Sequence, residues 1–171
     1  ISEQELQAYL PNTKRQCLFP DDHCPVNLME LGRVLGWHSL SPLGMGIHAE
    51  YGLWSAYRAL WWLDAELETP ENRSNKTVPA TANTICAECE TQACISACPA
   101  SALSAKRMPD LSACADYRLS EDSQCHSDCL ARQACPVATE HRYTQAQMAY
   151  HYDLSRSAIA NYRSQTLKQE S

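Results

Sequence analysis

The cysteines of this chain constrain its fold more than any other feature. Ten occur in 171 residues, and eight of them lie between Cys86 and Cys135. They form two dense groups that each close on a Cys-Pro pair, with Cys114 alone between the groups. The groups read Cys86-x2-Cys89-x4-Cys94-x3-Cys98-Pro99 and Cys125-x3-Cys129-x5-Cys135-Pro136.

Eight thiolates are the ligand complement of two cubane [4Fe-4S] clusters with four cysteines each. Thiolates are the soft anionic ligands that such clusters need, and close spacing lets one loop wrap several corners of a cube. In two-cluster proteins the cysteine before the proline belongs to the other cluster. The sequence therefore predicts one cluster on Cys86, Cys89, Cys94 and Cys135, and a second on Cys98, Cys114, Cys125 and Cys129.

Other uses of the cysteines stay open. The Cys86-x2-Cys89 pair also has the spacing of a structural zinc site, and His126 lies within the second group. Disulfides are a further alternative, although they more often link elements that are far apart in the chain than cysteines within one short loop. Cys17 and Cys24 lie outside both groups, and even with His23 they lack the ligands for a third metal site.

Composition excludes several classes of function. The net charge of −6 argues against nucleic acid as the main partner, because phosphate binding needs a basic surface. No apolar run approaches the ~20 residues of a membrane span. No signal peptide is visible, but the sequence begins at Ile1 and leaves open whether a targeting segment precedes it. Free thiolates and oxygen-sensitive clusters lead us to expect a reducing, cytoplasmic environment.

Pattern and composition predict an α+β chain. We expect a partial α/β unit over 1–67, a linker over 68–84, a cluster-binding unit over 85–140 and a helical tail over 141–171. The linker is rich in Pro, Asn, Ser, Thr and Lys. The glycines at 36, 44, 46 and 52 predict backbone with positive φ or a close approach to another group.

The same patterns predict the local elements. A short helix should end before Pro11, and a second should open at Pro25 and stop at Gly36, with a loop over 17–25 between them. Mixed periodicity leaves 53–67 ambiguous, and its aromatic residues favour a strand. In the tail, Thr144 should cap one helix and Ser155 a second.

A resemblance follows from the order of these motifs. The chain has Gly36-Trp37, then Ile-His-Ala-Glu-Tyr-Gly-Leu-Trp over 47–54, then the two Cys-Pro groups around a lone cysteine. This order resembles the C-terminal iron–sulfur part of epoxyqueuosine reductases and reductive dehalogenases over about residues 26–140. The run Cys-Glu-Thr-Gln-Ala-Cys at 89–94, with Ala-Cys-Pro at 97–99, is most similar to short ferredoxin-like relatives of that family.

The resemblance implies a bacterial two-[4Fe-4S] ferredoxin-like domain over 85–140. It also implies that the preceding unit is the end of a cobalamin-binding reductase domain, in which the clusters reduce a corrinoid. The chain departs from the family pattern by wider spacing in both cysteine groups, by the absence of a glycine-lysine pair after Gly36-Trp37, and by the absence of the upstream part with its catalytic acid. Neither a corrinoid site nor an acid is therefore assigned.

The best-supported function is electron transfer through two [4Fe-4S] clusters, with a redox partner protein or a corrinoid or flavin enzyme as partner. No catalytic residue is assigned, because the six histidines are scattered and no Ser/His/Asp set emerges. One alternative is a reductase that holds cobalamin or flavin near 36–52, beside His48, Glu50 and Tyr51. The other is a zinc-stabilised interaction protein.

Overall fold

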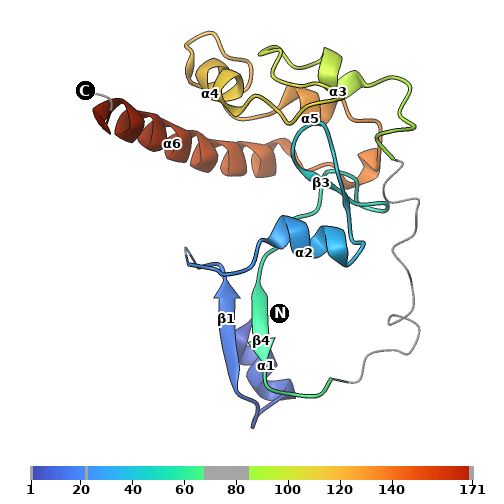
Figure 1. Cartoon of the computed structure of the whole chain (residues 1–171), viewed down its shortest axis with the longest axis vertical. Coiled ribbons are helices and arrows are strands. Elements are labelled where there is room, and N and C mark those ends of the chain that lie inside the picture. Colours follow the sequence, from blue (N-terminus) through green and yellow to red (C-terminus); the bar gives the residue numbers. More distant parts are fainter. Residues whose placement is uncertain (1, 22, 68–84, 170–171) are drawn as a thin grey trace.

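The structure is a computed structural model that describes residues 2–21, 23–67 and 85–169 (Figure 1). The expected linker over 68–84 lies outside these residues. The helices are α1 (Glu3–Tyr9), α2 (Leu28–Val34), α3 (Ala93–Ser96), α4 (Leu111–Leu119), α5 (Leu130–Gln133), η2 (Thr139–His141) and α6 (Gln145–Gln169). The strands are β1 (Arg15–Phe19), β2 (Ser39–Leu40), β3 (Gly46–Ile47) and β4 (Leu60–Leu63).

Mixed helices and small sheets make this an α+β protein, as predicted. The strands form two ribbons, β1 with β4 and β2 with β3, and both pairs are antiparallel. In the described part of the chain no strand pair is parallel, so the unit over 1–67 lacks the parallel sheet expected of an α/β unit. Among the same residues, no helix combines the length and hydropathy that a bilayer span requires.

Helix α1 precedes the β1–β4 ribbon and is capped at its N-terminus. Ser2 and Glu5 form a capping box at the start of α1, and Leu6 on this helix is buried. The chain then turns into β1, which pairs with β4 in a register that places Arg15 opposite Leu63. The helix before Pro11 is therefore confirmed, whereas the expected loop over 17–25 begins inside β1.

The predicted strand over 53–67 is confirmed only at Leu60–Leu63. Leu53 and Trp54 precede it, and their side chains are 1% and 4% exposed. Leu53 belongs to the buried core together with Ile47 and Cys135. Packing against the cysteine unit thus fixes this end of the segment, and tertiary contact overrides its strand propensity.

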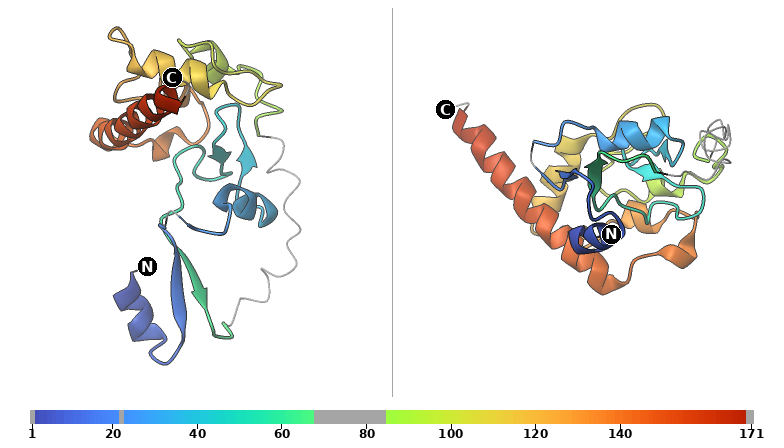
Figure 2. Two further views of the ribbon diagram at one scale, coloured as in Figure 1. Left: turned by 60° about the vertical axis from the view of Figure 1, so that its left-hand side comes forward. Right: turned by 90° about the horizontal axis from the view of Figure 1, so that it is seen from below.

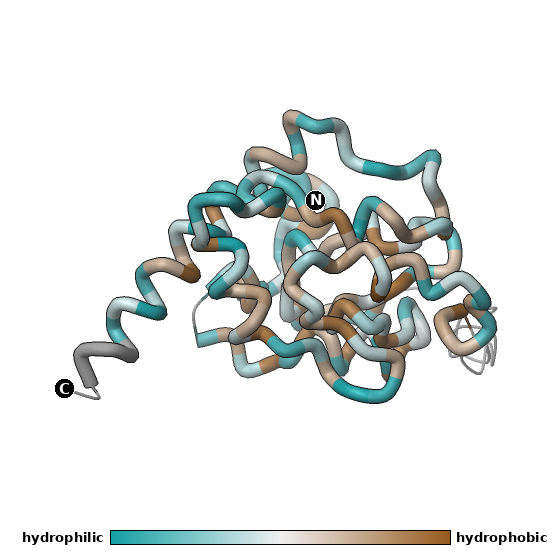
Figure 3. The backbone as a smooth tube through the Cα atoms, turned by 90° about the horizontal axis from the view of Figure 1, so that it is seen from above, coloured by the Kyte–Doolittle hydropathy of each residue, from teal (hydrophilic) through white to brown (hydrophobic). Residues whose placement is uncertain are grey.

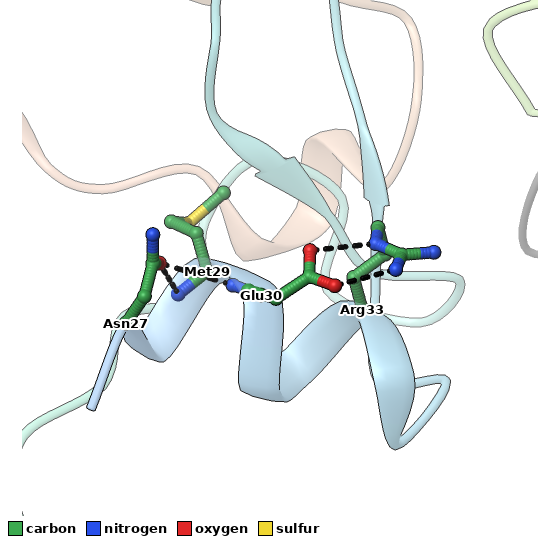
Figure 4. Close-up of polar contacts among 4 residues, drawn as sticks. All are labelled: Asn27, Met29, Glu30 and Arg33. Atoms are coloured by element: carbon green, nitrogen blue, oxygen red, sulfur yellow. Dashed lines mark hydrogen bonds and ion pairs between the residues drawn. The ribbon is translucent and has the colours of Figure 1, made fainter.

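The helix expected at Pro25 begins three residues later, at Leu28. The Asn27 side chain accepts hydrogen bonds from the backbone N–H groups of Met29 and Glu30, and so supplies the N-cap (Figure 4). One turn further along the same helix, Arg33 forms an ion pair with Glu30, which Figure 4 also shows. Gly36 follows with φ of 69°, as expected for a helix stop.

The cysteine unit lies at the other end of the molecule from the β1–β4 ribbon, with α2 between them (Figure 1). Here α3 packs against α5, and α4 packs against α6. In the backbone coloured by hydropathy, α6 extends away from the rest of the molecule and carries both polar and apolar residues along its length (Figure 3).

The tail is one continuous helix, which corrects the expectation of two. Thr144 and Gln147 form the predicted capping box at its start. Ser155 does not cap a second helix, because its hydroxyl donates to the Tyr152 carbonyl within α6. The helix runs beside α4 (Figure 2), where Arg163 forms an ion pair with Asp116.

Candidate metal centre

Four of the eight clustered cysteines line one cavity of about 650 Å³, which we call the Cys86 cavity. They are Cys86, Cys89, Cys94 and Cys135, the set that the sequence assigned to the first cluster. Cys86 and Cys89 lie on a turn closed by a backbone hydrogen bond of 3.4 Å between them. Cys94 comes from α3, and Cys135 follows α5 and is 6% exposed.

The other four cysteines line a second cavity of about 160 Å³, the Cys114 cavity. They are Cys98, Cys114, Cys125 and Cys129, the second predicted set. Cys114 lies in α4, whose first turn is capped by the Asp110 side chain. Cys129 immediately precedes α5. The position of α4 therefore places Cys114, which is isolated in the sequence, beside the other three cysteines.

The short helix α3 connects the two cavities. Cys94 lies within it and lines the Cys86 cavity, whereas Cys98 lies two residues beyond its end and lines the Cys114 cavity. Gln92 opens this helix with a left-handed φ of 41°, which turns the chain sharply between Cys89 and Cys94. One turn of chain thus supplies a thiol to each cavity.

Burial and mutual proximity set the electrostatics of the Cys86 cavity. Burial raises the pKa of Cys86 to about 11, and the neighbouring thiols of Cys135, Cys94 and Cys89 add to the rise. Burial also raises the pKa of Cys94. Cys89 is the exception, since hydrogen bonds from Thr91 and nearby backbone lower its pKa. Buried thiols that raise one another's pKa favour a bound cation, which would relieve the repulsion between thiolates.

The Cys114 cavity differs because it contains a buried cation. Burial, and then the nearby Cys129, raises the pKa of Cys114, while Arg118 opposes the rise. Arg118 is 7% exposed, and its guanidinium donates to the carbonyl of Cys125. The guanidinium also lies 4.8 Å from the centre of the Tyr152 ring. Burial, and then the nearby Cys129, raises the pKa of Tyr152, which lines the same cavity.

Arg132 is a second buried cation in this unit. It comes from α5 and is 6% exposed. Its guanidinium lies over the rings of Trp54 and Tyr143 at 4.5 and 5.0 Å, and donates to the carbonyl of Leu53. It thereby joins the cysteine unit, the N-terminal segment and the start of the tail. No spacing in the sequence indicated a role for Arg118, Arg132 or Tyr152.

The thiols surround each cavity rather than meet at one point. Within the described residues, no three His, Cys, Asp or Glu side chains converge closely enough to hold a single metal ion. All ten cysteines are free thiols. A zinc ion would need its ligands gathered at about 2.3 Å from one centre. A cubane instead takes four soft sulfur ligands at separate corners, which fits four cysteines placed around a cavity.

The remaining candidates lie apart from both cavities. The thiol of Cys17 is exposed and contacts the Phe19 carbonyl at 3.1 Å, and that of Cys24 contacts the Val26 carbonyl at 3.6 Å. His23 is exposed. The Nε2 atom of His126 lies 2.7 Å from the Ser120 carbonyl oxygen, so this ring is held by backbone.

Comparison with known proteins found no match. None of the family models, curated proteins and solved structures that were compared matches the chain.

Proposed function

We propose that this chain is an iron–sulfur electron-transfer protein that carries two [4Fe-4S] clusters, with a two-cluster ferredoxin-like domain over 85–140. The observation that supports it is the division of eight cysteines into two sets of four, each set around its own cavity. Four cysteines per cluster is the usual ligand complement. When bound, each cluster supplies a centre that accepts and releases one electron.

The chain's own residues complete these centres. Cys86, Cys89, Cys94 and Cys135 would hold one cluster, and Cys98, Cys114, Cys125 and Cys129 the other. Arg118 places a positive charge beside the second set, which offsets part of the negative charge of four thiolates. Ile47 and Leu53, both 1% exposed, pack with Cys135 and keep water from that side of the first set.

The proposed setting follows from the same chemistry. Free thiols and clusters require a reducing compartment, which in a bacterial cell is the cytoplasm. The net charge of −6 favours a partner with a basic surface. A redox protein or a corrinoid or flavin enzyme would meet this description.

Metal analysis of anaerobically purified full-length protein tests the proposal. We expect about eight iron and about eight acid-labile sulfide per chain, with a broad absorbance near ~400 nm that bleaches on reduction. Zinc without iron would refute the proposal and favour a zinc-stabilised interaction protein. Corrin absorption bands in the same preparation would instead favour a corrinoid reductase.

Paired cysteine variants test the division into two sets. Cys114→Ala should lower the iron content from about eight to about four per chain, because only one set loses a ligand. Cys17→Ala is the matched control, since Cys17 is exposed and lines neither cavity, and it should keep the full iron content. A Cys114→Ala protein with full iron would break the assignment.

A further inference from the structure

A third cavity, of about 660 Å³, lies beside the cysteine cavities but contains none of their thiols. We call it the aromatic cavity, because its walls include Phe19, Trp37, His38, His48, Tyr51 and Tyr57. Its lining residues come from the end of β1, the start of α2, the β2–β3 hairpin and the segment before β4. Its volume falls within the range of small-molecule sites, about 300–1,000 Å³.

One short segment separates this cavity from the cysteines. Gly44, Gly46 and His48 line the aromatic cavity, whereas Leu43 lines the Cys114 cavity and Ile47 the Cys86 cavity. Met45 lines both the aromatic and the Cys114 cavity. A molecule in the aromatic cavity would therefore lie one strand away from both sets of thiols.

The wall of the cavity is held in a fixed arrangement. His38 is 6% exposed and fits between two glycines, because a Cβ on Gly46 would lie 2.6 Å from its ring and one on Gly32 2.5 Å. Its Nδ1 lies 2.7 Å from the Tyr57 hydroxyl, and the ring also hydrogen-bonds to the Met29 backbone. Burial lowers the pKa of His38, which keeps the ring neutral. The Tyr57 hydroxyl and Nδ1 share one hydrogen bond, and whichever group donates, the hydroxyl oxygen keeps a lone pair that can accept another.

His48 supplies the complementary donor. Its Nδ1 accepts hydrogen bonds from the backbone N–H groups of Glu50 and Tyr51, at 3.0 and 3.2 Å. The hydrogen of the neutral ring is therefore on Nε2, at the opposite edge. The His48 ring also stacks on Tyr51 with 4.8 Å between centroids. The cavity thus holds one oriented N–H donor beside an aromatic surface.

The charge of the cavity selects its ligand. Among the described residues that line it, none is Lys, Arg, Asp or Glu. An anionic ligand would lose its hydration without gaining a positively charged partner, which is costly. Trp37 is 49% exposed and offers a ring face at the rim, where planar molecules stack, whereas the ring of Tyr51 is already stacked on His48.

We infer that the aromatic cavity is a binding site for an uncharged planar conjugated ring with a carbonyl oxygen, the chemistry shared by quinones and the flavin ring. The carbonyl oxygen accepts from His48, the Tyr57 oxygen accepts from a ring N–H or hydroxyl, and the ring stacks on Trp37. Electron exchange between the bound ring and the cysteine sets would need the proposed clusters, so this part rests on the proposed function. Binding of the ring does not depend on the clusters.

Titration of the anaerobically purified full-length protein with riboflavin tests the inference, followed by quenching of riboflavin fluorescence. Saturable binding at one site per chain is expected. Trp37→Ala should weaken it about tenfold, and Tyr57→Phe should weaken it at least about threefold, because riboflavin has a ring N–H and hydroxyls that the Tyr57 oxygen would accept from. Trp62→Ala is the matched control, because Trp62 is 50% exposed on β4 and lines no part of the cavity.

A second pair of probes tests the charge argument. Anthraquinone carrying a hydroxymethyl group should bind, and the same ring carrying a sulfonate should bind at least about tenfold more weakly. Absence of saturable binding by both uncharged probes overturns the site. Equal weakening by Trp37→Ala and Trp62→Ala, or tight binding of the sulfonate, overturns it as well. Iron is measured in the same sample, so binding without iron refutes only the proposed function, and iron without binding refutes only this site.

Discussion

Arg132 offers the sharpest test of how the units are held together. Its guanidinium is buried between the rings of Trp54 and Tyr143 and donates to the Leu53 carbonyl. The substitution Arg132→Met keeps an unbranched side chain of similar length and removes the charge. We expect the variant to fold but to lose stability.

The size of the loss follows from the contacts. A hydrogen bond from a charged donor contributes about 1.5–3 kcal/mol, and each partly desolvated cation–π contact about 0.5–2 kcal/mol. Against this, the Nε–H of Arg132 is buried without a partner in the described part of the chain, and its removal returns about 1–3 kcal/mol. The expected net loss is about 2 kcal/mol.

Urea denaturation followed by tryptophan fluorescence measures this loss. With a slope of about 2 kcal/mol per M, the midpoint should fall by about 1 M. Arg33→Met is the control, because Arg33 forms only an exposed ion pair with Glu30 and should leave the midpoint unchanged. An Arg132→Met midpoint equal to that of the parent protein would refute the reasoning, and so would an equal shift in both variants.

Three further predictions concern residues that line the cavities or pack against their walls. Gly32→Ala should destabilise the protein by about 1–3 kcal/mol in thermal denaturation, although it would stabilise an open helix, because the new Cβ would lie 1.7 Å from the Tyr57 hydroxyl. The free energy of unfolding should fall as the pH drops below about 6.5, because burial lowers the pKa of His38 and the unfolded chain therefore takes up the proton first. Urea midpoints measured at several pH values should fall less steeply in His38→Gln than in the parent protein. Tyr152→Phe should lower the reduction potential of one of the proposed clusters, read by potentiometric titration, because it removes the polar hydroxyl from the cavity that Cys129 lines, and that hydroxyl favours the more negative, reduced state.

Controls separate these effects from general damage. Tyr150 lies on the same helix as Tyr152 but is 64% exposed, so Tyr150→Phe should leave both potentials unchanged. A Gly32→Ala protein as stable as the parent would contradict the close contact seen here. Identical pH profiles for the parent and His38→Gln would show that another group governs the acid limb.

Local features of this protein could be predicted from the sequence because they depend on neighbouring residues. The capping box of Thr144 and Gln147 and the positive φ of Gly36 are properties of a single turn. Cysteine spacing also predicted the two sets of four that line the cavities, since short loops limit which thiols can meet. That these sets hold iron stays a prediction.

The rest was decided by contacts between residues far apart in the chain. Burial of Leu53 and Trp54 against the cysteine unit confined the predicted strand to Leu60–Leu63. Arg118 reaches the Cys114 cavity and α6 at once, through the Cys125 carbonyl and through a carbonyl 34 residues away. The aromatic cavity likewise joins β1, α2 and the β2–β3 hairpin. Sequence alone determined which thiols can gather, whereas only the packed tertiary structure could decide which cations and rings surround them, because such buried contacts depend on elements that no local pattern brings together.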